Sequence, residues 1–223
     1  MTTHTYYITG TDTDAGKTWV TTECLKALST SGIKAVGMKP VASGCELTSE
    51  GLRNEDALKL MAAGSIKLPY ELINPIALTE PTAPEIAAKH DGLEISLSPI
   101  LPAYEQIRKQ AELVLMEGVG GWMAPLSDTL EQADLVNEIR CPVILVVGLK
   151  LGCINHARLT EIAMKQDGVH CAGWIVADVD PNLLFAEEYF DALRRCMHTP
   201  YLGRVSADRP ARLDGFLAMC GVV

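Results

Sequence analysis

The sequence predicts an α/β protein, a single domain over residues 1–223 built on a mostly parallel sheet covered by helices on both faces. Short apolar runs rich in Val, Ile and Tyr recur between segments that have helical spacing. These runs are apolar at every position, which is typical of parallel strands buried on both faces. No linker or repeat divides the chain, and a chain of this length suffices for one core.

Six strands are expected in chain order, and the strands alternate with amphipathic helices. The strands cover residues 6–9, 35–39, 113–117, 143–148, 173–177 and 201–205. Helical apolar spacing is clearest over 17–29 and 183–197. The proline-rich stretch 69–102 breaks this rhythm and predicts loops and short helices over the carboxyl edge of the sheet, where ligands bind in such folds.

Composition excludes several classes of partner. The net charge of −9, from 19 Lys and Arg against 28 Asp and Glu, argues against nucleic-acid binding. Seven cysteines lie scattered with no paired spacing, which indicates reduced thiols rather than disulfides or a zinc site. Residues 1–10 lack the pattern of a signal peptide, and the apolar run 143–149 is too short to span a bilayer. We therefore expect a soluble cytoplasmic protein with no membrane partner.

The sharpest motif is a glycine-bearing loop between the first strand and the following helix. It reads Gly10-Thr-Asp-Thr-Asp-Ala-Gly16-Lys17-Thr18. A strand, a loop and a helix in this order favour phosphate binding by backbone N–H groups, with the lysine on the terminal phosphates and the hydroxyl on Mg²⁺. The strict G-x-x-x-x-G-K-[ST] spacing is not met, because the first glycine lies one residue early. A polar turn with an incidental G-K-T is therefore the alternative.

Four further polar residues follow predicted strands or begin a helix. Glu117 ends a strand directly before Gly118-Val-Gly-Gly121, a position that suits a Mg²⁺ ligand beside phosphates. Asp56 is a second candidate, although an acid in the first turn of a helix also stabilises the helix N-terminus. Lys39 and Ser43 follow the second strand and can meet an anion and a substrate there. The alternatives are a solvated loop acid for Glu117 and an ordinary surface lysine for Lys39.

The segment after the fourth predicted strand has structural explanations. Asn155 is predicted to cap the following helix. His156 in its first turn is more often structural than a ligand. Cys153 has no base near it in the sequence and is predicted to lie in the core.

Together the motifs resemble those of the dethiobiotin synthetase family, ATP-dependent enzymes of biotin synthesis. The likeness runs from about residue 6 to residue 178. The matching segments are Gly10-Thr-Asp-Thr-x-x-Gly16-Lys-Thr18, Lys39-Pro-Val-Ala-Ser-Gly44, Gly51-Leu-Arg-Asn-x-Asp56, Asn74-Pro75, Glu80-Pro81-Thr82, Glu117-Gly-x-Gly-Gly-Trp122, Pro125-Leu126 and Lys150-Leu-Gly-Cys-Ile-Asn-His156.

This resemblance implies a P-loop NTPase fold, a homodimer, and a ligase that joins CO₂ to 7,8-diaminononanoate with ATP and Mg²⁺. One amine captures CO₂ as a carbamate, and ATP then phosphorylates the carbamate to a carbamic-phosphoric anhydride. The neighbouring amine displaces phosphate and closes the ring of dethiobiotin. Catalysis of this kind depends on positioning and on cations, and requires no histidine base.

The resemblance also implies roles for particular residues. The implied metal ligands are Thr18, Asp56 and Glu117, and the implied catalytic residues are Lys17, Lys39 and Thr13. The implied nucleotide contacts are Asp14, Ala15, Gly16, Lys17, Thr18, Trp19, Asp56, Glu117, Gly118, Val119, Gly120, Ala177 and Asp178. The implied substrate contacts are Thr13, Ser43, Asn155 and Tyr189, the last two partly across a dimer interface.

The departures from the family pattern lie toward the C-terminus. The family usually has Asn where this chain has Ala177, and G-E-I-P where this chain has Gly203-Arg-Val-Ser206. An Asn amide can pair bidentately with adenine, so its absence predicts looser nucleotide choice. A cobyrinate-type amidating ligase and a nucleotide switch are the alternatives. The first needs an added glutamine-handling domain, and the second generally has an extra lysine early in the phosphate loop.

Overall fold

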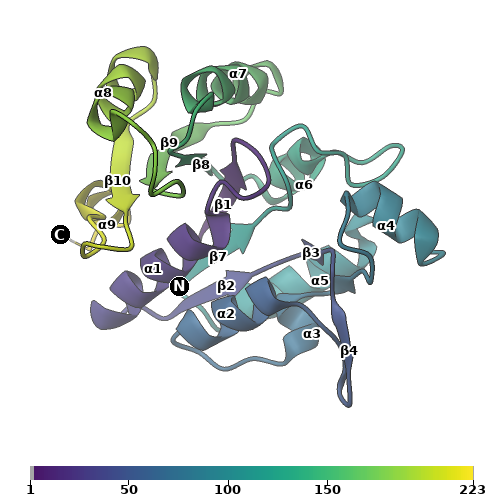
Figure 1. Cartoon of the computed structure of the whole chain (residues 1–223). Helices are drawn as coiled ribbons and strands as arrows, with labels where there is room; N and C mark the ends of the chain where they lie inside the picture. Colours follow the sequence, from purple (N-terminus) through teal and green to yellow (C-terminus); the bar gives the residue numbers. More distant parts are fainter. Residues whose placement is uncertain (1–2, 223) are drawn as a thin grey trace.

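The computed structural model describes residues 3–222, and its centre is a six-stranded parallel sheet (Figure 1). The strand order across the sheet is β10-β9-β8-β1-β7-β2, and every neighbouring pair is parallel. The strands are β1 (His4–Gly10), β2 (Ala35–Met38), β7 (Leu113–Glu117), β8 (Val143–Gly148), β9 (Cys171–Ala177) and β10 (Tyr201–Val205). All six strands expected from the sequence are confirmed.

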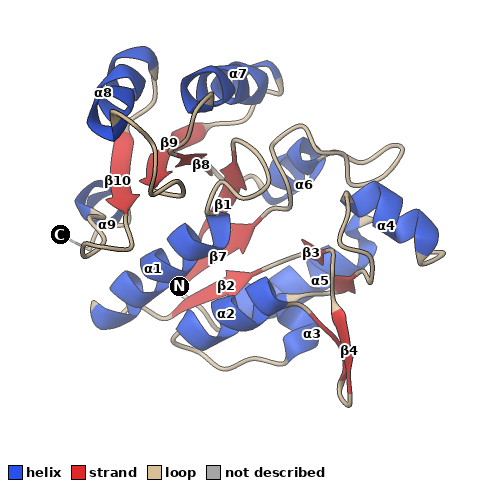
Figure 2. Ribbon diagram, viewed as in Figure 1, coloured by secondary structure: helices blue, strands red, loops and turns tan. Residues whose placement is uncertain are grey.

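Helices lie on both faces of this sheet, as Figure 2 shows. They are α1 (Lys17–Thr30), α2 (Glu55–Ala63), α3 (Tyr70–Ile73), α4 (Pro84–His90), α5 (Leu97–Arg108), α6 (Gln132–Ile139), α7 (Cys153–Gln166), α8 (Ala186–Cys196) and α9 (Asp214–Met219). Two small accessory sheets are β3 (Val41–Ala42) with β6 (Ile76–Ala77), and the hairpin of β4 (Glu46–Thr48) with β5 (Gly51–Arg53). Within residues 3–222 no helix has the length and apolar character that a bilayer span requires.

The core has two layers because side chains alternate across each strand. In β1, Ile8 packs on the face covered by α1 and α9, with Val20 and Phe216. Its neighbour Tyr7 points to the other face, where α3, α5, α6, α7 and α8 contribute buried side chains such as Ile107. Burial on both faces is the reason why the strands are apolar at every position.

Two helix boundaries differ from the sequence expectations. The helix expected over 183–197 begins only at Ala186, because Phe185 adopts a left-handed conformation with φ of 61°. The expected capping role of Asn155 is wrong. Gly152, with φ of 92°, is the N-cap of α7, so Asn155 lies inside the first turn and is exposed. The glycine reaches the left-handed conformation without strain and starts the helix early.

The expectation for 69–102 is right in its first part only. The short helices α3 and α4 and the short strand β6 occupy 70–90. A twelve-residue helix, α5, then begins at Leu97 and contains Pro102 in its interior. The buried face of α5, which includes Ile100 and Ile107, packs on the sheet. Burial of this face outweighs the cost of the proline, because tertiary packing supplies most helix stability in proteins.

Candidate functional site

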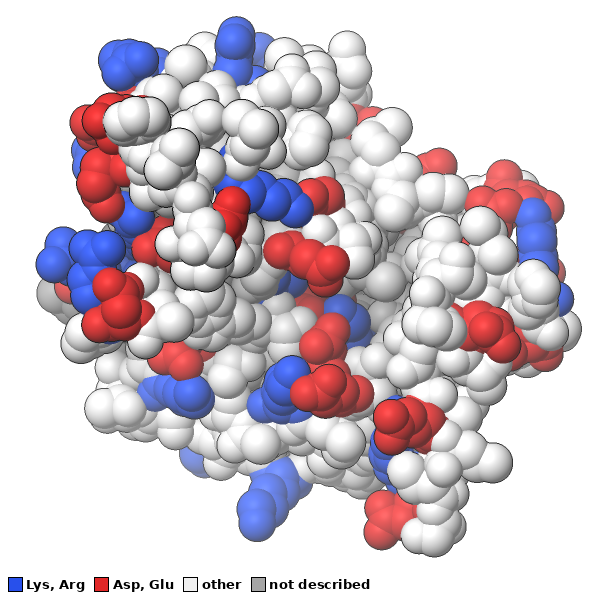
Figure 3. Space-filling model, in the orientation of Figure 1, with Lys and Arg blue, Asp and Glu red and all other residues white. Residues whose placement is uncertain are grey.

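A cavity of about 740 Å³ lies where the phosphate-loop candidate and the segments after β2 and β7 meet. It is lined by Thr13, Asp14, Gly16, Lys17, Thr18, Trp19, Lys39, Ser43, Asn54, Asp56, Pro81, Thr82, Ala83, Pro84, Val119, Gly120, Gly121 and Ala124. Figure 3 shows acidic and basic side chains side by side near the centre of the face in view. Residues from the motif segments 10–18, 39–44, 51–56, 80–82 and 117–122 therefore converge on one cavity at the carboxyl edge of the sheet.

The loop between β1 and α1 has the backbone of an anion site. Gly16 is the N-cap of α1 with φ of 88°, and no side chain caps the free N–H groups of the first turn. A side chain at Gly16 would place its Cβ 2.7 Å from the Cβ of Ala177, so glycine is required for space as well as conformation. The Nζ of Lys17 donates to the carbonyl of Asp12 at 2.9 Å, and burial lowers the pKa of Lys17 to about 8. A helix N-terminus with an adjacent cation favours phosphate.

Lys39 is the buried cation at the centre of the cavity wall. Its Nζ lies 2.6 Å from Glu117 Oε1, 3.2 Å from the carbonyl of Gly118 and 3.5 Å from Asp56 Oδ2. Burial alone lowers the pKa of Lys39, but the carboxylates of Glu117 and Asp56 outweigh burial and raise it. The lysine is therefore charged and held in place by both acids.

Three oxygen donors lie at or directly behind the cavity wall, because Thr18 and Asp56 line the cavity and the fully buried Glu117 contacts Thr18 and Lys39 of that wall. The hydroxyl of Thr18 donates to Glu117 Oε1 at 2.7 Å, and Glu117 Oε2 is buried with no hydrogen-bond partner among the described residues. Asp56 lines the cavity and is partly exposed. A hydroxyl and two carboxylates suit Mg²⁺, which prefers oxygen ligands. The unpartnered oxygen of Glu117 is an acceptor that such a cation would satisfy, so the residues present fit the ion.

Ser43 and Thr13 lie on the same cavity. The hydroxyl oxygen of Ser43 is buried and has no hydrogen-bond partner among residues 3–222. Thr13 is exposed in the phosphate loop. A buried hydroxyl without a partner is costly unless a ligand or water bonds to it, so Ser43 is available to a bound substrate.

Sequence reasoning missed Asn54, which organises this wall of the cavity. Its side chain accepts a hydrogen bond from the N–H of Ala57 and donates to the carbonyl of Ser43 at 3.1 Å. It therefore caps α2, places Asp56 in the first turn and fixes the backbone of Ser43. The signal was present as an asparagine directly before a helical segment with two acids at its start. Pro81 and Thr82 belong to a segment that carries the family resemblance, but no role in the site was predicted for the wall formed by 81–84.

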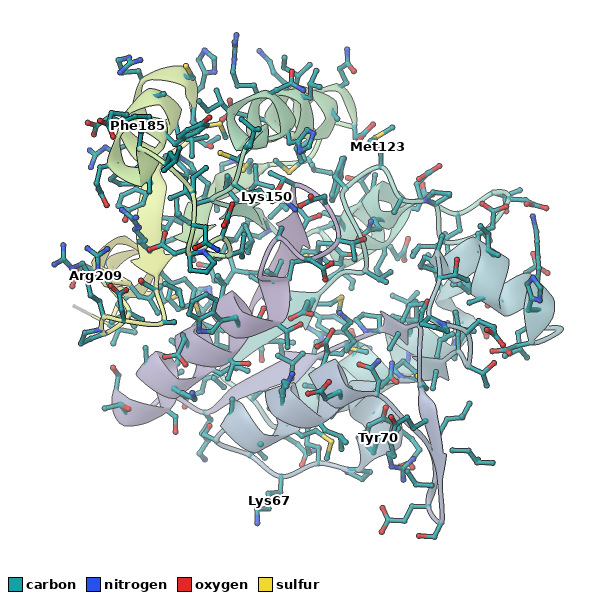
Figure 4. The ribbon with its side chains drawn as sticks, viewed as in Figure 1. Lys67, Tyr70, Met123, Lys150, Phe185 and Arg209 are labelled. Carbon is teal, nitrogen blue, oxygen red and sulfur yellow. The ribbon has the colours of Figure 1, made fainter. Side chains whose placement is uncertain are left out.

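A second missed contact ties the phosphate loop to the loop before α7. The Nζ of Lys150 lies 2.6 Å from Asp12 Oδ2, and Figure 4 shows Lys150 beside the loop that follows β1. The hydroxyl of Thr11 donates to the other carboxylate oxygen of Asp12. The carboxylate thus links two loops at the same sheet edge.

Several residues expected in the site do not line the cavity. Ala15, Glu117 and Ala177 are fully buried, and Gly118 is not part of the cavity lining either. Asp178 accepts from Arg204 Nε at 2.8 Å. Asn155 is exposed on α7, and Tyr189 is partly buried on α8. One chain therefore brings together the expected phosphate, metal and lysine groups, and leaves the residues expected at the base and at the far end of the substrate outside this cavity.

Comparison with known proteins adds independent findings. A family model described as an AAA domain matches residues 4–211. The ATP-dependent dethiobiotin synthetase BioD of Xanthomonas axonopodis pv. citri (strain 306) is 55% identical over 200 residues, which cover 90% of this chain and 89% of that protein. The protein of the same name from Xylella fastidiosa (strain 9a5c) is 50% identical over 200 residues, with 90% and 88% coverage.

Solved structures show the fold. The hydrogenase maturation factor HypB from Archaeoglobus fulgidus aligns with a TM-score of 0.55 at 12% identity, covering 98% of this chain and 89% of that one. The MinC:MinD cell division complex of Aquifex aeolicus gives a TM-score of 0.52 at 14% identity, with coverage of 91% and 81%. At these identities the likeness concerns the fold alone, and it confirms the expected α/β fold of the P-loop NTPase type.

Proposed function

Because this chain belongs to the ATP-dependent dethiobiotin synthetase family, we propose that it carboxylates and cyclises 7,8-diaminononanoate with CO₂ and ATP to give dethiobiotin, ADP and phosphate. The single observation that carries the proposal is the convergence of Lys17, Lys39 and Ser43 on one cavity. The helix N-terminus and two lysines supply positive charge where a triphosphate and a carbamate would otherwise repel each other.

The reaction has three bond-forming steps. The nitrogen of one amine attacks CO₂ and loses a proton, which gives the carbamate. A carbamate oxygen then attacks the γ-phosphorus of ATP, and ADP leaves. The neighbouring amine attacks the carbonyl carbon of the resulting anhydride, phosphate leaves with the electron pair of the broken C–O bond, and the second C–N bond closes the ring with loss of a proton.

The residues of the cavity have distinct tasks in this scheme. The phosphate loop, with Lys17, holds the terminal phosphates in line with the attacking oxygen. Lys39 lines the cavity next to Glu117 and pairs with the carbamate. The negative charge of the carbamate moves toward phosphorus in the second step. The hydroxyls of Thr13 and Ser43 orient the diamine. Positioning and charge of this kind supply most of the rate enhancement in phosphoryl transfer.

A divalent cation is part of the proposal. Thr18, Asp56 and Glu117 would hold Mg²⁺, which neutralises the charge on the phosphate oxygens when bound. Because Lys39 binds the same oxygen of Glu117 that accepts from Thr18, the lysine and the threonine fix the orientation of the carboxylate before the nucleotide arrives. The unpartnered oxygen of Glu117 supports this assignment.

We place the enzyme in the cytoplasm as a homodimer. Met123, Leu151, Leu159 and Ile162 are exposed apolar side chains, and Figure 4 shows Met123 at the surface. Asn155, Leu159 and Ile162 share one face of α7, because they are spaced four and three residues apart. An interface on this face buries the apolar patch and brings Asn155 toward a second copy. The mass of the protein in solution, measured by light scattering after size exclusion, tests the dimer.

One assay tests the activity. The chain is incubated with the diamine, bicarbonate, Mg²⁺ and ATP, and dethiobiotin is sought by mass spectrometry. We expect a product that depends on all four components. Hydrolysis of ATP without dethiobiotin would instead favour a nucleotide switch or another ligase on the same scaffold.

A further inference from the structure

Two buried polar side chains lie next to the loop 118–124, which forms part of the cavity wall. Tyr7, on β1, is 1% exposed, and Gln132, the first residue of α6, is fully buried. The Tyr7 hydroxyl donates to Gln132 Oε1 at 2.7 Å. Burial raises the pKa of Tyr7, so its hydroxyl remains a proton donor. Because an apolar pair of similar shape is about as stable as a satisfied polar pair, stability alone does not account for these two residues.

The other end of the Gln132 amide holds a loop. Its Nε2 lies 2.6 Å from the carbonyl of Gly121, 3.2 Å from that of Trp122 and 3.4 Å from that of Ala124. Two amide hydrogens thus serve three carbonyls of the loop 118–124. The Tyr7 hydroxyl fixes which end of the amide is the oxygen, and therefore keeps the N–H groups directed at the loop.

The start of the loop packs against the same pair, and it is held by hydrogen bonds to the carbonyl of Ile8 and to Lys39. Lys39 Nζ donates to the carbonyl of Gly118. A Cβ at Gly118 would lie 2.6 Å from the Tyr7 hydroxyl and would collide with Gln132 Oε1. Only a glycine lets the backbone lie directly on the polar pair, so the loop is fixed at both ends.

The middle of the loop faces the cavity. Val119, Gly120 and Gly121 line the cavity. Their backbone N–H groups make no hydrogen bond within residues 3–222. A Cβ at Gly120 would lie 3.9 Å from the Thr13 hydroxyl oxygen, so the loop approaches the side of the cavity to which the diamine is assigned. The three N–H groups are available to the oxygens of a bound substrate.

We propose that Tyr7 and Gln132 are positioning residues, which hold the loop 118–124 in the shape that receives the diamine and its carbamate. The inference rests on the proposed function for the identity of the substrate. According to the proposal, Tyr7 and Gln132 contribute to the affinity for the substrate although they lie outside the cavity. Their removal should therefore weaken substrate binding without an equal loss of fold stability or of nucleotide binding. The family resemblance implies nucleotide contacts for Gly118, Val119 and Gly120, whereas the proposal gives the N–H groups of 119–121 to the substrate because this loop lies beside Thr13. The proposal leaves the nucleotide phosphates to the phosphate loop, which Gln132 does not contact through a hydrogen bond.

The test uses four variants of the full chain. Gln132→Met removes the amide at similar volume, Tyr7→Phe removes the orienting hydroxyl, and a double variant removes both. Tyr104→Phe is the matched control, because it removes another buried tyrosine hydroxyl, one that is 2.8 Å from Thr5 Oγ1 on the same strand as Tyr7. For each variant one measures kcat, KM for the diamine, Kd for ATP, the melting temperature, and amide hydrogen exchange of residues 119–124.

Gln132→Met should raise KM for the diamine at least about tenfold and change the Kd for ATP less than about threefold. Tyr7→Phe should shift KM in the same direction by less, and the control should lower the melting temperature without changing KM. Exchange of the Ala124 amide, whose N–H donates to the carbonyl of Gly121 at 3.0 Å, should be faster in Gln132→Met and unchanged in the control. The double variant should lose less melting temperature than the two single variants lose in total. Its KM for the diamine should nevertheless stay raised.

Two results would overturn the inference. One is an unchanged KM in Gln132→Met, and the other is a KM that returns to normal together with the melting temperature in the double variant. Absence of dethiobiotin from the unmodified chain is a different failure, since it overturns the proposed function and removes the diamine from this loop.

Discussion

Replacement of Lys39 by methionine should lower both the stability and the turnover of this protein. The lysine neutralises Glu117, which is fully buried and 2.6 Å away. Removal of one partner of a buried ion pair costs about 3–5 kcal/mol, because the other charge is left without compensation. The cavity is open to water at Asp56, so we take the lower value, about 3 kcal/mol. For a chain of this size each kcal/mol shifts the melting temperature by about 2–4 °C, which gives a decrease of roughly 6–12 °C.

The assay is thermal unfolding of Lys39→Met with and without Mg²⁺. Added Mg²⁺ should recover part of the lost stability, because a cation bound at Glu117 replaces the missing charge. Turnover should fall at least about 100-fold, the scale of one electrostatic contact to the transition state. The matched control is Lys59→Met on α2, where the lost pair with Glu55 is exposed and contributes little. A variant that melts within about 2 °C of the unmodified chain, and does not respond to Mg²⁺, would refute this reasoning.

Three further outcomes are expected. Asp56→Ala should raise the Mg²⁺ concentration needed for half-maximal activity. If the variant instead loses about 0.5–1 kcal/mol of stability and keeps its Mg²⁺ dependence, Asp56 only stabilises the N-terminus of α2. Because Ala177 has no amide, kcat/KM for CTP, GTP or UTP should come within about 100-fold of that for ATP, and strict use of ATP would show that another group reads the base. Burial raises the pKa of Glu161, but hydrogen bonds from Thr199 and His198 outweigh it and hold the pKa below 4.5. Its stabilisation is therefore complete above pH 4.5 and is lost as the pH falls through the lower folded value, so unfolding free energies of Glu161→Gln and the unmodified chain should converge in acid.

The phosphate loop is the part of the site that local sequence determines most fully. Gly10 ends a strand, Gly16 adopts the left-handed conformation and Lys17 begins the helix, all within eight positions of one another. Each of these features depends on local backbone preference and on the order of strand, loop and helix. The same holds for the alternation of apolar runs, which predicted a sheet buried on both faces.

Other features were decided by contacts between distant positions. Pro102 lies inside a helix because the buried face of α5 has the sheet to pack on, which a local reading of proline does not include. Asn155 was expected to cap α7, but Gly152 reaches the required conformation earlier in the chain. The local preference of Pro102 was outweighed by packing on the sheet, and that of Asn155 by the left-handed conformation of Gly152.

The sequence by itself determined the six strands of the main sheet, the phosphate loop with the helix that follows it, and the family pattern of Lys39, Asp56 and Glu117. Only the tertiary structure decided that Lys39 and Glu117, 78 positions apart, form a buried pair, and that Tyr7 and Gln132, 125 positions apart, meet beneath the loop 118–124. The physical reason is that a buried polar group must find its partner wherever the packed chain offers one. The distance along the sequence between two such partners is set by the topology of the sheet, and it leaves no local pattern.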